Sequence, residues 1–315
     1  MSERKPVVLV TGASGFVGRH VAPALIAQGW SVRRAVRGPE GLDDEVVIAS
    51  IGPETNWQAV LDGVDAVVHL AARVHHKHEE HAVQLYHNVN VAGTLHLARS
   101  AAAAGVRQFI FISTVLVHGR SNDGRAPFSE DDVLTPRALY GISKAAAEAG
   151  LKTLARDSDM KISVIRPPLV YGAGAKGNFA LLSRAVCLGL PLPFAAVRNQ
   201  RAFLAVQNLS SFILRRLADP DSASNFEVFL IADKEQVSTP EFIERLARAA
   251  GKRPRLFAVP QDLLGSVLGV VGRQDTHDSL IGSLELNISK AIATGWRPEV
   301  SLDEGLRLAL SAQDA

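Results

Sequence analysis

Near its start the chain reads VVLVTGASGFVG from Val7 to Gly18, and this stretch decides the fold. Its apolar opening predicts a buried strand, and its end begins an apolar-periodic helix. Between them, Gly12 permits a tight turn, Gly15 lets the backbone approach a pyrophosphate closely, and Gly18 lets the helix pack onto the sheet. A glycine-rich turn in this strand–turn–helix setting predicts a dinucleotide site at the helix N-terminus.

The same alternation continues along the first half of the chain. Further strands are predicted at Val32–Val36, Val46–Ile48, Ala66–Leu70, Gln108–Ser113 and Ile162–Arg166, and helices at Phe16–Ala27, Trp57–Leu61, Val83–Ala104 and Leu139–Ala155. Strands that alternate with helices in this way predict an α/β fold, a Rossmann-type doubly wound parallel sheet. Pro23 lies inside the first helix, where we expect it to cost a hydrogen bond or cause a kink.

The texture of the sequence changes after Pro167-Pro168, where glycine and proline become frequent. We therefore predict a dinucleotide-binding domain over residues 1–170 and a smaller, mainly substrate-binding C-terminal lobe over 171–315. Strands at Phe203–Val206 and Phe226–Ile231 are expected to return to the main sheet, and Thr239–Ala250 is expected to form a capped amphipathic helix.

The composition bounds the class of protein. The chain has 315 residues with 47% hydrophobic and 21% charged residues, a formal net charge of +2 and a pI of about 8.8. We expect no nucleic-acid partner, because no basic stripe is present. Cys187 is the single cysteine, which excludes an internal disulfide and a cysteine-based zinc site. The N-terminus lacks the apolar region of a signal peptide, and Leu263–Gly272 is too short to span a bilayer, so we expect a cytoplasmic protein without a membrane partner.

The end of the second strand indicates which dinucleotide fits. An acidic residue there hydrogen-bonds the ribose hydroxyl of NAD, whereas arginine suits the 2′-phosphate of NADP. This chain has Arg33-Arg34-Ala35-Val36-Arg37 and no carboxylate. We predict NADP, with Arg34 and Arg37 as candidate clamps. The alternatives are NAD as cofactor and arginines that are only solvated surface residues.

Tyr140 and Lys144 are four residues apart, which places them on one face of a helix. A phenol has a reference pKa near 10, and an adjacent ammonium would lower it toward a useful range. Thr135-Pro136 resembles a cap and first-turn proline for this helix. Ser113-Thr114 ends the fifth strand, where the carboxyl edge of a parallel sheet forms the ligand crevice. We predict a catalytic set of Tyr140, Lys144 and Thr114.

These pieces together resemble the extended short-chain dehydrogenase/reductase family over nearly the whole chain. The matching motifs are the glycine-rich turn, His69-Leu70-Ala71-Ala72, Asn90-Val91-Ala92-Gly93-Thr94, Ser113-Thr114, Tyr140 with Lys144, and Arg166-Pro167-Pro168-Leu169-Val170-Tyr171-Gly172. The resemblance implies cofactor contacts by Gly12, Ser14, Gly15, Phe16, Val17, Gly18, Ile51, Leu70, Ala71, Ala72, Asn90, Ser113, Tyr140, Lys144 and Pro167. It also implies a homodimer, for which the alanine-rich helices Leu95–Ala104 and Ala145–Ala155 offer smooth faces.

Within that family the chain is similar to the nucleotide-sugar branch, near UDP-glucose 4-epimerases and 4-ketohexose reductases. The motifs that carry this similarity are Gly177-Asn178-Phe179, Leu190–Phe194, Arg198–Arg201 and Gly295-Trp296-Arg297-Pro298. The similarity implies substrate contacts by Arg73, Thr114, Val115, Asn178 and Arg201, with Asn178 and Arg201 on the diphosphate of a sugar that we expect to be UDP-linked. Two departures stand out: Ser50-Ile51 replaces an acid often found near the adenine, and His118 replaces a tyrosine.

The residues after Thr114 narrow the chemistry. A 4,6-dehydratase of this family carries an acid and a base directly after the catalytic threonine, but here Val115 and Leu116 stand there. We predict reduction at C4 of a UDP-4-keto-6-deoxy sugar in polysaccharide biosynthesis, with Tyr140 protonating the oxygen, Lys144 holding the ribose and Thr114 orienting the carbonyl. The alternatives are a UDP-sugar 4-epimerase, an NADPH reductase of a non-nucleotide carbonyl, and a non-enzymatic NADP sensor.

Histidine is concentrated in one stretch. Seven of the ten histidines lie between His69 and His96, and four of them fall in His75–His81. Histidine and carboxylate side chains at such spacings can ligate zinc or nickel. A polar loop beside the site is the simpler interpretation, and we predict no metal because hydride transfer needs none.

Overall fold

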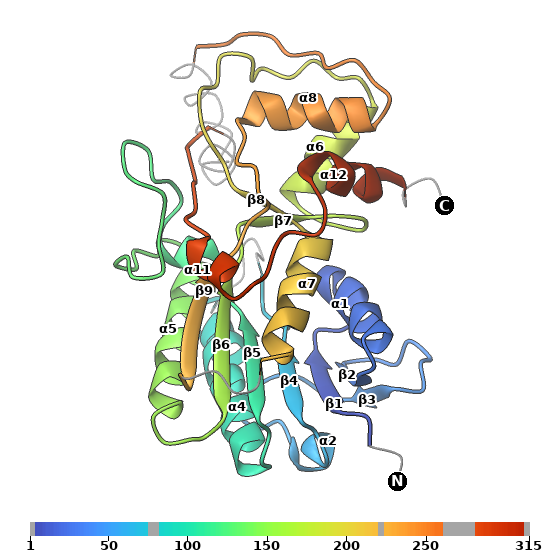
Figure 1. Cartoon of the computed structure of the whole chain (residues 1–315), viewed down its shortest axis with the longest axis vertical. Helices are drawn as coiled ribbons and strands as arrows, with labels where there is room; N and C mark the ends of the chain where they lie inside the picture. Colours follow the sequence, from blue (N-terminus) through green and yellow to red (C-terminus); the bar gives the residue numbers. More distant parts are fainter. Residues whose placement is uncertain (1–3, 75–81, 220–223, 261–280, 312–315) are drawn as a thin grey trace. The chain divides into compact units, whose positions relative to one another are not determined.

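The computed structural model describes residues 4–74, 82–219, 224–260 and 281–311 (Figure 1). Its main sheet has seven strands in the order β3-β2-β1-β4-β5-β6-β9. These are β1 Val7–Thr11, β2 Ser31–Val36, β3 Glu45–Val47, β4 Ala66–His69, β5 Gln108–Ile112, β6 Lys161–Arg166 and β9 Phe226–Leu230. Strands β1 to β6 pair in parallel, and the order turns back between β1 and β4. The predicted α/β, Rossmann-type class is confirmed.

Helices cover both faces of this sheet. They are α1 Phe16–Ala27, α2 Gln58–Leu61, α3 Ala82–Tyr86, α4 Thr94–Ala103, α5 Leu139–Leu154 and α7 Val206–Leu217. One core cluster joins the strands to α2, α4 and α5 through buried residues such as Trp57, Leu97, Phe109 and Leu151. Figure 1 shows α1 and α7 on the opposite face. The strands are therefore covered on both sides, which explains their continuous apolar runs.

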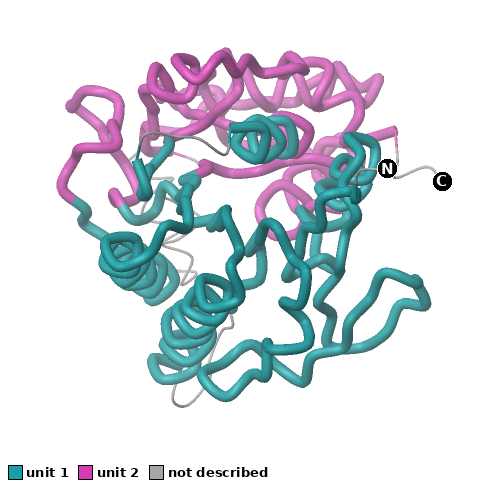
Figure 2. The backbone as a smooth tube through the Cα atoms, turned by 60° about the horizontal axis from the view of Figure 1, so that its bottom comes forward, with its two compact units in different colours: residues 1–117, 134–166, 210–229 teal, residues 118–133, 167–209, 230–315 magenta. Residues whose placement is uncertain are grey.

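The chain divides into two compact units (Figure 2). Unit 1 contains residues 1–117, 134–166 and 210–229, and unit 2 contains 118–133, 167–209 and 230–315. Unit 2 therefore begins near the predicted boundary at residue 170 but also takes an earlier loop. The elements of unit 2 are β7 Leu169–Tyr171, β8 Phe203–Ala205, α6 Asn178–Cys187, α8 Thr239–Ala249, α11 Ser289–Ala293 and α12 Leu302–Ser311.

Three details of the predicted elements were wrong. Phe203–Ala205 does not join the main sheet, because it pairs in parallel with β7 as a separate two-stranded sheet; of the two late strands only β9 returns. The predicted helix Val83–Ala104 is interrupted by a π-helical segment, η1, over His87–Gly93. Helix α5 begins at Leu139 after Ala138, which gives no side-chain cap, so Thr135-Pro136 does not start it.

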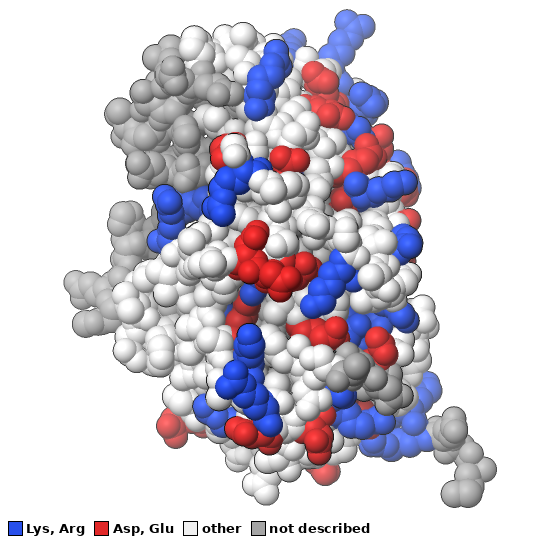
Figure 3. All heavy atoms as spheres, turned by 60° about the vertical axis from the view of Figure 1, so that its left-hand side comes forward, with Lys and Arg blue, Asp and Glu red and all other residues white. Residues whose placement is uncertain are grey.

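The surface is mixed in charge on the face that Figure 3 presents, where basic and acidic side chains are interspersed. This pattern agrees with the small formal net charge of +2. Within the described parts of the chain, every helix falls short of the length and apolar character needed to cross a membrane.

Candidate active site

The glycine-rich turn between β1 and α1 has the shape that a dinucleotide diphosphate needs. Gly12 has a φ of +71°, and a Cβ there would lie 2.7 Å from the backbone nitrogen of Ala71. A Cβ at Gly18 would collide with the backbone of Gly12 and Ala13, so both glycines are required by the protein's own packing. At Gly15, by contrast, a Cβ would meet only the Gly12 carbonyl oxygen at 3.1 Å, and the residue is exposed.

Helix α1 offers its N-terminal N–H groups to a ligand. Gly15 is the N-cap, the cap provides no side-chain hydrogen bond, and the first turn carries no acidic residue. The N–H groups of a first helical turn need partners from outside the helix, and an anion is a suitable one. Ser14 and Gly15 are exposed, while Phe16 and Val17 are half-buried. These residues fit the diphosphate of a nicotinamide dinucleotide and would hold it through backbone N–H groups.

The two candidate clamps at the end of β2 have different surroundings. Arg34 forms an ion pair with Asp44 at 2.8 Å, and only 13% of its side chain is exposed. Arg37 is exposed and makes no hydrogen bond or ion pair with any other described residue. Arg33 donates to the carbonyl oxygens of Val60 and Asp62. Arg37 is therefore available for a phosphate, whereas Arg34 already has a carboxylate partner.

Asn90 ties together the chain after β4 and helix α5. Its Oδ1 accepts from the Arg73 backbone nitrogen at 2.7 Å, and its Nδ2 donates to the Arg73 carbonyl oxygen and to Ser143 Oγ at 2.9 Å. Asn90 lies within the π-helical segment η1, a rare geometry that often marks functional sites. The segment following β4, Leu70-Ala71-Ala72, is half-buried beside these bonds, and Ile51 packs against η1 at Gly93.

Tyr140 and Lys144 lie on α5 beside the end of β5. The Lys144 ammonium donates to the Ile112 carbonyl oxygen at 2.7 Å and lies 4.3 Å from the centre of the Phe111 ring. It is 5.9 Å from the centre of the Tyr140 ring. Lys144 is almost completely buried, and Tyr140 is partly buried. The structure thus brings the predicted pair to the end of the strand that carries Ser113 and Thr114.

The protonation of the pair differs from the sequence expectation. Burial raises the pKa of Tyr140 to about 12, with a smaller contribution from Tyr86. Burial lowers the pKa of Lys144 to about 7, although the Glu148 carboxylate acts in the opposite direction. The expected lowering of the phenol pKa by the ammonium is therefore wrong for the protein alone, because the loss of hydration outweighs it. At neutral pH Tyr140 carries its proton and can donate it.

A buried ionic cluster below the site was missed by the sequence reasoning. Ser113 Oγ donates to Glu148 Oε1, and Arg166 Nη2 pairs with Glu148 Oε2 at 2.6 Å. All three residues are nearly inaccessible to solvent. Glu148 lies four residues after Lys144 on α5, so its spacing from the predicted lysine was the signal that could have revealed it. The cluster fastens the ends of β5 and β6 to the helix that carries Tyr140.

Thr114 and Val115 complete the described site in unit 1. Both are buried, and Thr114 Oγ1 accepts a hydrogen bond from the Leu116 nitrogen at 3.2 Å. His69, at the end of β4, is fully buried between Thr11 Oγ1 at 2.6 Å and Thr94 Oγ1 at 2.9 Å. Burial lowers the pKa of His69 to about 3, with Lys144 contributing, so this imidazole is neutral and structural.

Two of the predicted substrate residues, and the predicted cofactor contact Pro167, belong to unit 2. Asn178 is the first residue of α6, is exposed, and lines a cavity of about 20 Å³ with Leu169 and Phe242. Arg201 is buried, and its guanidinium donates to the Gly282 carbonyl oxygen. Pro167 is the first residue of this segment of unit 2.

Of the remaining histidines discussed from the sequence, His118 is described by the structure and the stretch from His75 to His81 is not. His118, which stands in place of the tyrosine of the family, is buried in unit 2 and stacks on Phe128 with ring centres 5.1 Å apart. The histidine stretch His75–His81 lies outside the described residues. Among the residues that the structure does describe, no group of histidine, cysteine and carboxylate side chains is arranged to hold a metal ion.

Sequence comparisons with known proteins point to the same class of enzyme as the geometry of the site. The profile of the NAD dependent epimerase/dehydratase family matches residues 8–232. A UDP-glucose 4-epimerase of Vibrio cholerae is 38% identical over 310 residues, covering 95% of this chain and 93% of the relative. A GDP-6-deoxy-D-mannose reductase of Pseudomonas aeruginosa is 28% identical over 324 residues, covering 96% of each chain.

Solved structures give the same result. MoeE5 in complex with UDP-glucuronic acid and NAD has a TM-score of 0.78, 25% identity and coverage of 98% of both chains. RMD from Pseudomonas aeruginosa, complexed with NADPH, has a TM-score of 0.74, 26% identity and the same coverage. The chain is thus similar to epimerases and reductases of nucleotide sugars. Because two of the similar structures contain NAD or NADPH, a nicotinamide cofactor is supported. The chain belongs to the NAD dependent epimerase/dehydratase family, a group of enzymes within the extended short-chain dehydrogenase/reductases.

Proposed function

We propose that this protein is an NADPH-dependent reductase that acts at C4 of a UDP-4-keto-6-deoxy sugar, in the cytoplasm and in the service of polysaccharide biosynthesis. The observation that carries the proposal is the position of Tyr140 and Lys144 beside Ser113-Thr114 at the carboxyl end of β5. The exposed Arg37 at the end of β2, with no acid in that strand, favours NADPH.

The chain's own residues have clear tasks in such a reduction. When bound, the reduced nicotinamide supplies the hydride. Tyr140, protonated at neutral pH, donates its proton to the carbonyl oxygen, and the Lys144 ammonium stabilises the phenolate that forms. Thr114 holds the same oxygen by a hydrogen bond. Ser14 and Gly15 would hold the diphosphate at α1, and Asn90 keeps the chain after β4 in place beside α5.

A UDP-sugar 4-epimerase is the second candidate, favoured by the similarity to the Vibrio cholerae protein. An epimerase regenerates its cofactor in each turnover and therefore needs no external supply. Turnover assays of the purified protein separate the two. A reductase consumes NADPH only when a UDP-keto sugar is present and yields a product two hydrogens heavier. Conversion of UDP-galactose without added cofactor would instead establish the epimerase.

The same assays distinguish the nucleotide-sugar reductase from a reductase of non-nucleotide carbonyls and from a non-enzymatic sensor. A reductase of non-nucleotide carbonyls would not be inhibited by UDP, because only the nucleotide-sugar proposal places a diphosphate on Asn178 and Arg201. A non-enzymatic sensor would bind NADPH tightly and reduce none of the sugars offered. The predicted homodimer is tested separately by sedimentation of the purified protein.

A matched pair of variants, Arg37→Ala and Arg34→Ala, tests the preference for NADPH over NADH. Loss of a charge-assisted contact to the 2′-phosphate costs about 1.5–3 kcal/mol, so Arg37→Ala should weaken NADPH binding about tenfold or more and leave NADH binding unchanged. Arg34 is held by Asp44, so Arg34→Ala should leave the preference unaltered. Titration calorimetry measures both without turnover. Equal loss of NADPH and NADH affinity in Arg37→Ala would contradict the assignment.

A further inference from the structure

Exposed apolar side chains gather on one part of unit 2. Five large apolar side chains are exposed among the described residues of this unit, and all but Val133 lie on or beside α6. Leu181 and Leu188 are 63% and 64% exposed, and Leu190 and Phe257 are about half exposed. A single exposed leucine is ordinary, but a cluster marks an interaction surface.

The cluster is continuous in the structure. Leu181, Arg184 and Leu188 recur at intervals of three and four residues, which places them on one face of α6. The chain that leaves α6 then runs beside residues 255–257: Leu192 N donates to the Arg255 carbonyl oxygen at 2.8 Å, and Phe257 N donates to the Leu192 carbonyl oxygen at 3.1 Å. We call this surface the α6 patch, and it consists of Leu181, Arg184, Leu188, Leu190, Arg255 and Phe257.

The two chain segments that carry the α6 patch are basic. No aspartate or glutamate occurs between Asp159 and Asp219, nor from Arg245 to Pro260. Lys176, Lys252 and Arg253 are exposed near its two segments. None of these three, nor Arg184, forms an ion pair with a described residue.

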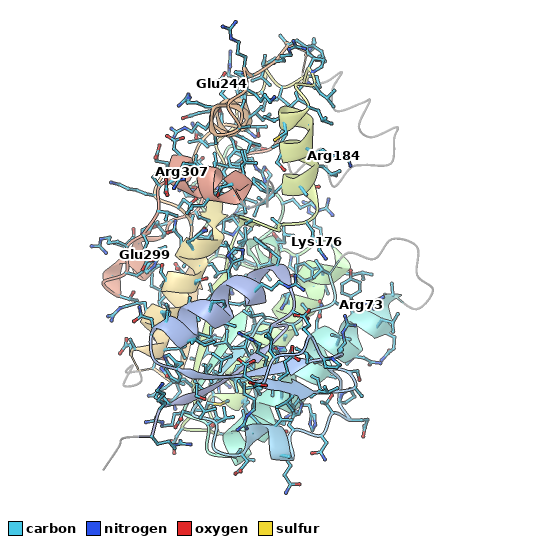
Figure 4. The ribbon with its side chains drawn as sticks, turned by 90° about the vertical axis from the view of Figure 1, so that its right-hand side faces the viewer. Arg73, Lys176, Arg184, Glu244, Glu299 and Arg307 are labelled. Carbon is cyan, nitrogen blue, oxygen red and sulfur yellow. The ribbon has the colours of Figure 1, made fainter. Side chains whose placement is uncertain are left out.

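Two other basic residues of unit 2, on helices other than α6, are paired with carboxylates. Arg245 on α8 pairs with Glu235 at 2.9 Å and with Glu241 at 2.6 Å, and Arg307 on α12 pairs with Glu304 at 2.6 Å. In Figure 4, Arg184 and Lys176 lie toward one side of unit 2, while Glu244 on α8 lies toward the other. The segments that expose leucine and phenylalanine thus also carry basic side chains without a carboxylate partner among the described residues.

We propose that the α6 patch binds the surface of an anionic membrane, with its leucines and Phe257 entering the headgroup boundary and its arginines contacting lipid phosphates. Apolar side chains interspersed with lysine and arginine are the combination that interfacial segments use, and each basic residue near an anionic surface adds to the affinity. This contact needs no spanning helix. It goes beyond the sequence expectation of no membrane partner, which rested on the lack of a signal peptide and of a segment long enough to cross a bilayer.

A second copy of the chain fits this surface less well. A two-fold contact places the same patch on both copies, so Arg184 and Arg255 of one would face the same bases of the other without an intervening acid. A nucleic acid would leave four apolar side chains without a suitable partner. The anionic bilayer satisfies both the charge and the apolar surface.

Vesicle sedimentation of the full chain tests the proposal. The probes are phosphatidylcholine vesicles with and without phosphatidylglycerol. The wild-type chain should pellet with the anionic vesicles, bind the neutral ones at least about tenfold more weakly, and be released by salt. Absence of anionic binding, or equal binding to both vesicles, overturns the proposal.

Matched variants locate the contact. L188S/F257S and R184Q/R255Q should each reduce anionic binding about tenfold or more. V133S and R125Q, which change exposed residues of the same unit, should bind like the wild type. Thermal midpoints establish that all four fold. Unchanged binding by the first two variants overturns the proposal, as does a dimer that L188S/F257S abolishes in a chain that ignores vesicles. The readout is independent of turnover, so it stands apart from the proposed reductase activity.

Discussion

A comparison of Tyr140 in unit 1 with Tyr171 in unit 2 shows what makes a phenol chemically useful. Tyr140 lies on α5 of unit 1, and its ionic neighbour on the helix is the Lys144 ammonium. Tyr171 ends β7 of unit 2 and is fully buried, and its hydroxyl donates to Asp233 Oδ2 at 2.7 Å. Burial raises the pKa of both, but at Tyr171 the Asp233 carboxylate raises it further.

The difference lies in what a phenolate would meet. Beside Lys144, the negative charge that forms when Tyr140 gives up its proton is stabilised. Beside Asp233, whose carboxylate also accepts from Ala205 N and Asn208 Nδ2, a second negative charge would be repelled. The fit around Tyr171 is also close, because a Cβ at Gly305 would lie 2.6 Å from its hydroxyl. Tyr171 therefore has the surroundings of a structural phenol, whereas Tyr140 has those that the proposed proton donor needs.

Tyr140→Phe should have the largest effect of these variants. We expect it to reduce turnover and to leave binding and stability unchanged. Removing a general acid costs about 10²- to 10⁴-fold in rate, so kcat/KM for the keto sugar should drop by that factor. Cofactor binding and the thermal midpoint should stay near wild type, because no buried carboxylate loses its partner. Steady-state kinetics and titration calorimetry check this. Wild-type turnover by Tyr140→Phe would remove the basis of the proposed mechanism.

Tyr171→Phe should show the reverse pattern. It leaves Asp233 Oδ2 buried without its donor, which costs about 1–3 kcal/mol in the free energy of unfolding. Urea denaturation measures the loss, and kcat/KM should remain within about twofold of wild type if the effect is confined to unit 2. A large fall in kcat/KM with unchanged stability would mean that the two tyrosines do not differ as argued.

Glu148→Gln should have a smaller effect, which appears as a change in pH dependence. The proposed reduction needs the Lys144 ammonium, so activity should fall as pH rises through the pKa of about 7. The Glu148 carboxylate raises that pKa, and its removal should therefore move the fall to lower pH. A shift of one unit corresponds to about tenfold in activity on the alkaline side.

The control for Glu148→Gln is Glu227→Gln, which weakens another ion pair of a buried arginine in unit 1. Glu227 pairs with Arg216 at 2.7 Å, away from Lys144 in the sequence and on β9. Glu227→Gln should lower the free energy of unfolding and leave the pH dependence of activity unchanged. Equal profiles for Glu148→Gln and the wild type would show that the carboxylate acts only as a structural partner of Arg166.

The local pattern of apolar residues in the sequence was sufficient to predict most strands of the main sheet. The β-branched runs and the apolar periodicity located β1 to β6, because the side chains of buried parallel strands and of packed helices repeat at fixed intervals. The same pattern predicted an uninterrupted helix over residues 83–104, and this prediction was wrong. The π-helical segment there is accompanied by three hydrogen bonds between Asn90 and two residues distant in the sequence: Asn90 accepts one from Arg73 and donates one each to Arg73 and Ser143. Periodicity describes which face is apolar and contains no information on such bonds.

The site was predictable to a similar depth. Tyr140, Lys144 and Thr114 could be predicted as a catalytic set because their spacing and their place at a strand end are local properties. The spacing of Glu148 from Lys144 could have pointed to Glu148, but its ion pair with Arg166 was missed, because a pair between a helix and a strand 18 residues apart leaves no periodic signal. The same holds for Asp44, whose pairing with Arg34 distinguishes the two candidate clamps.

By itself the sequence determined the strand–turn–helix that suits a dinucleotide, the succession of strands and helices along the first half of the chain, and the residues proposed for proton transfer, because each depends on neighbours within a few positions. The tertiary structure decided which charges are neutralised and which remain available, and how far the pKa values of Tyr140 and Lys144 move from their ordinary range. Those properties depend on desolvation and on charges brought close from remote parts of the chain, and only folding creates them.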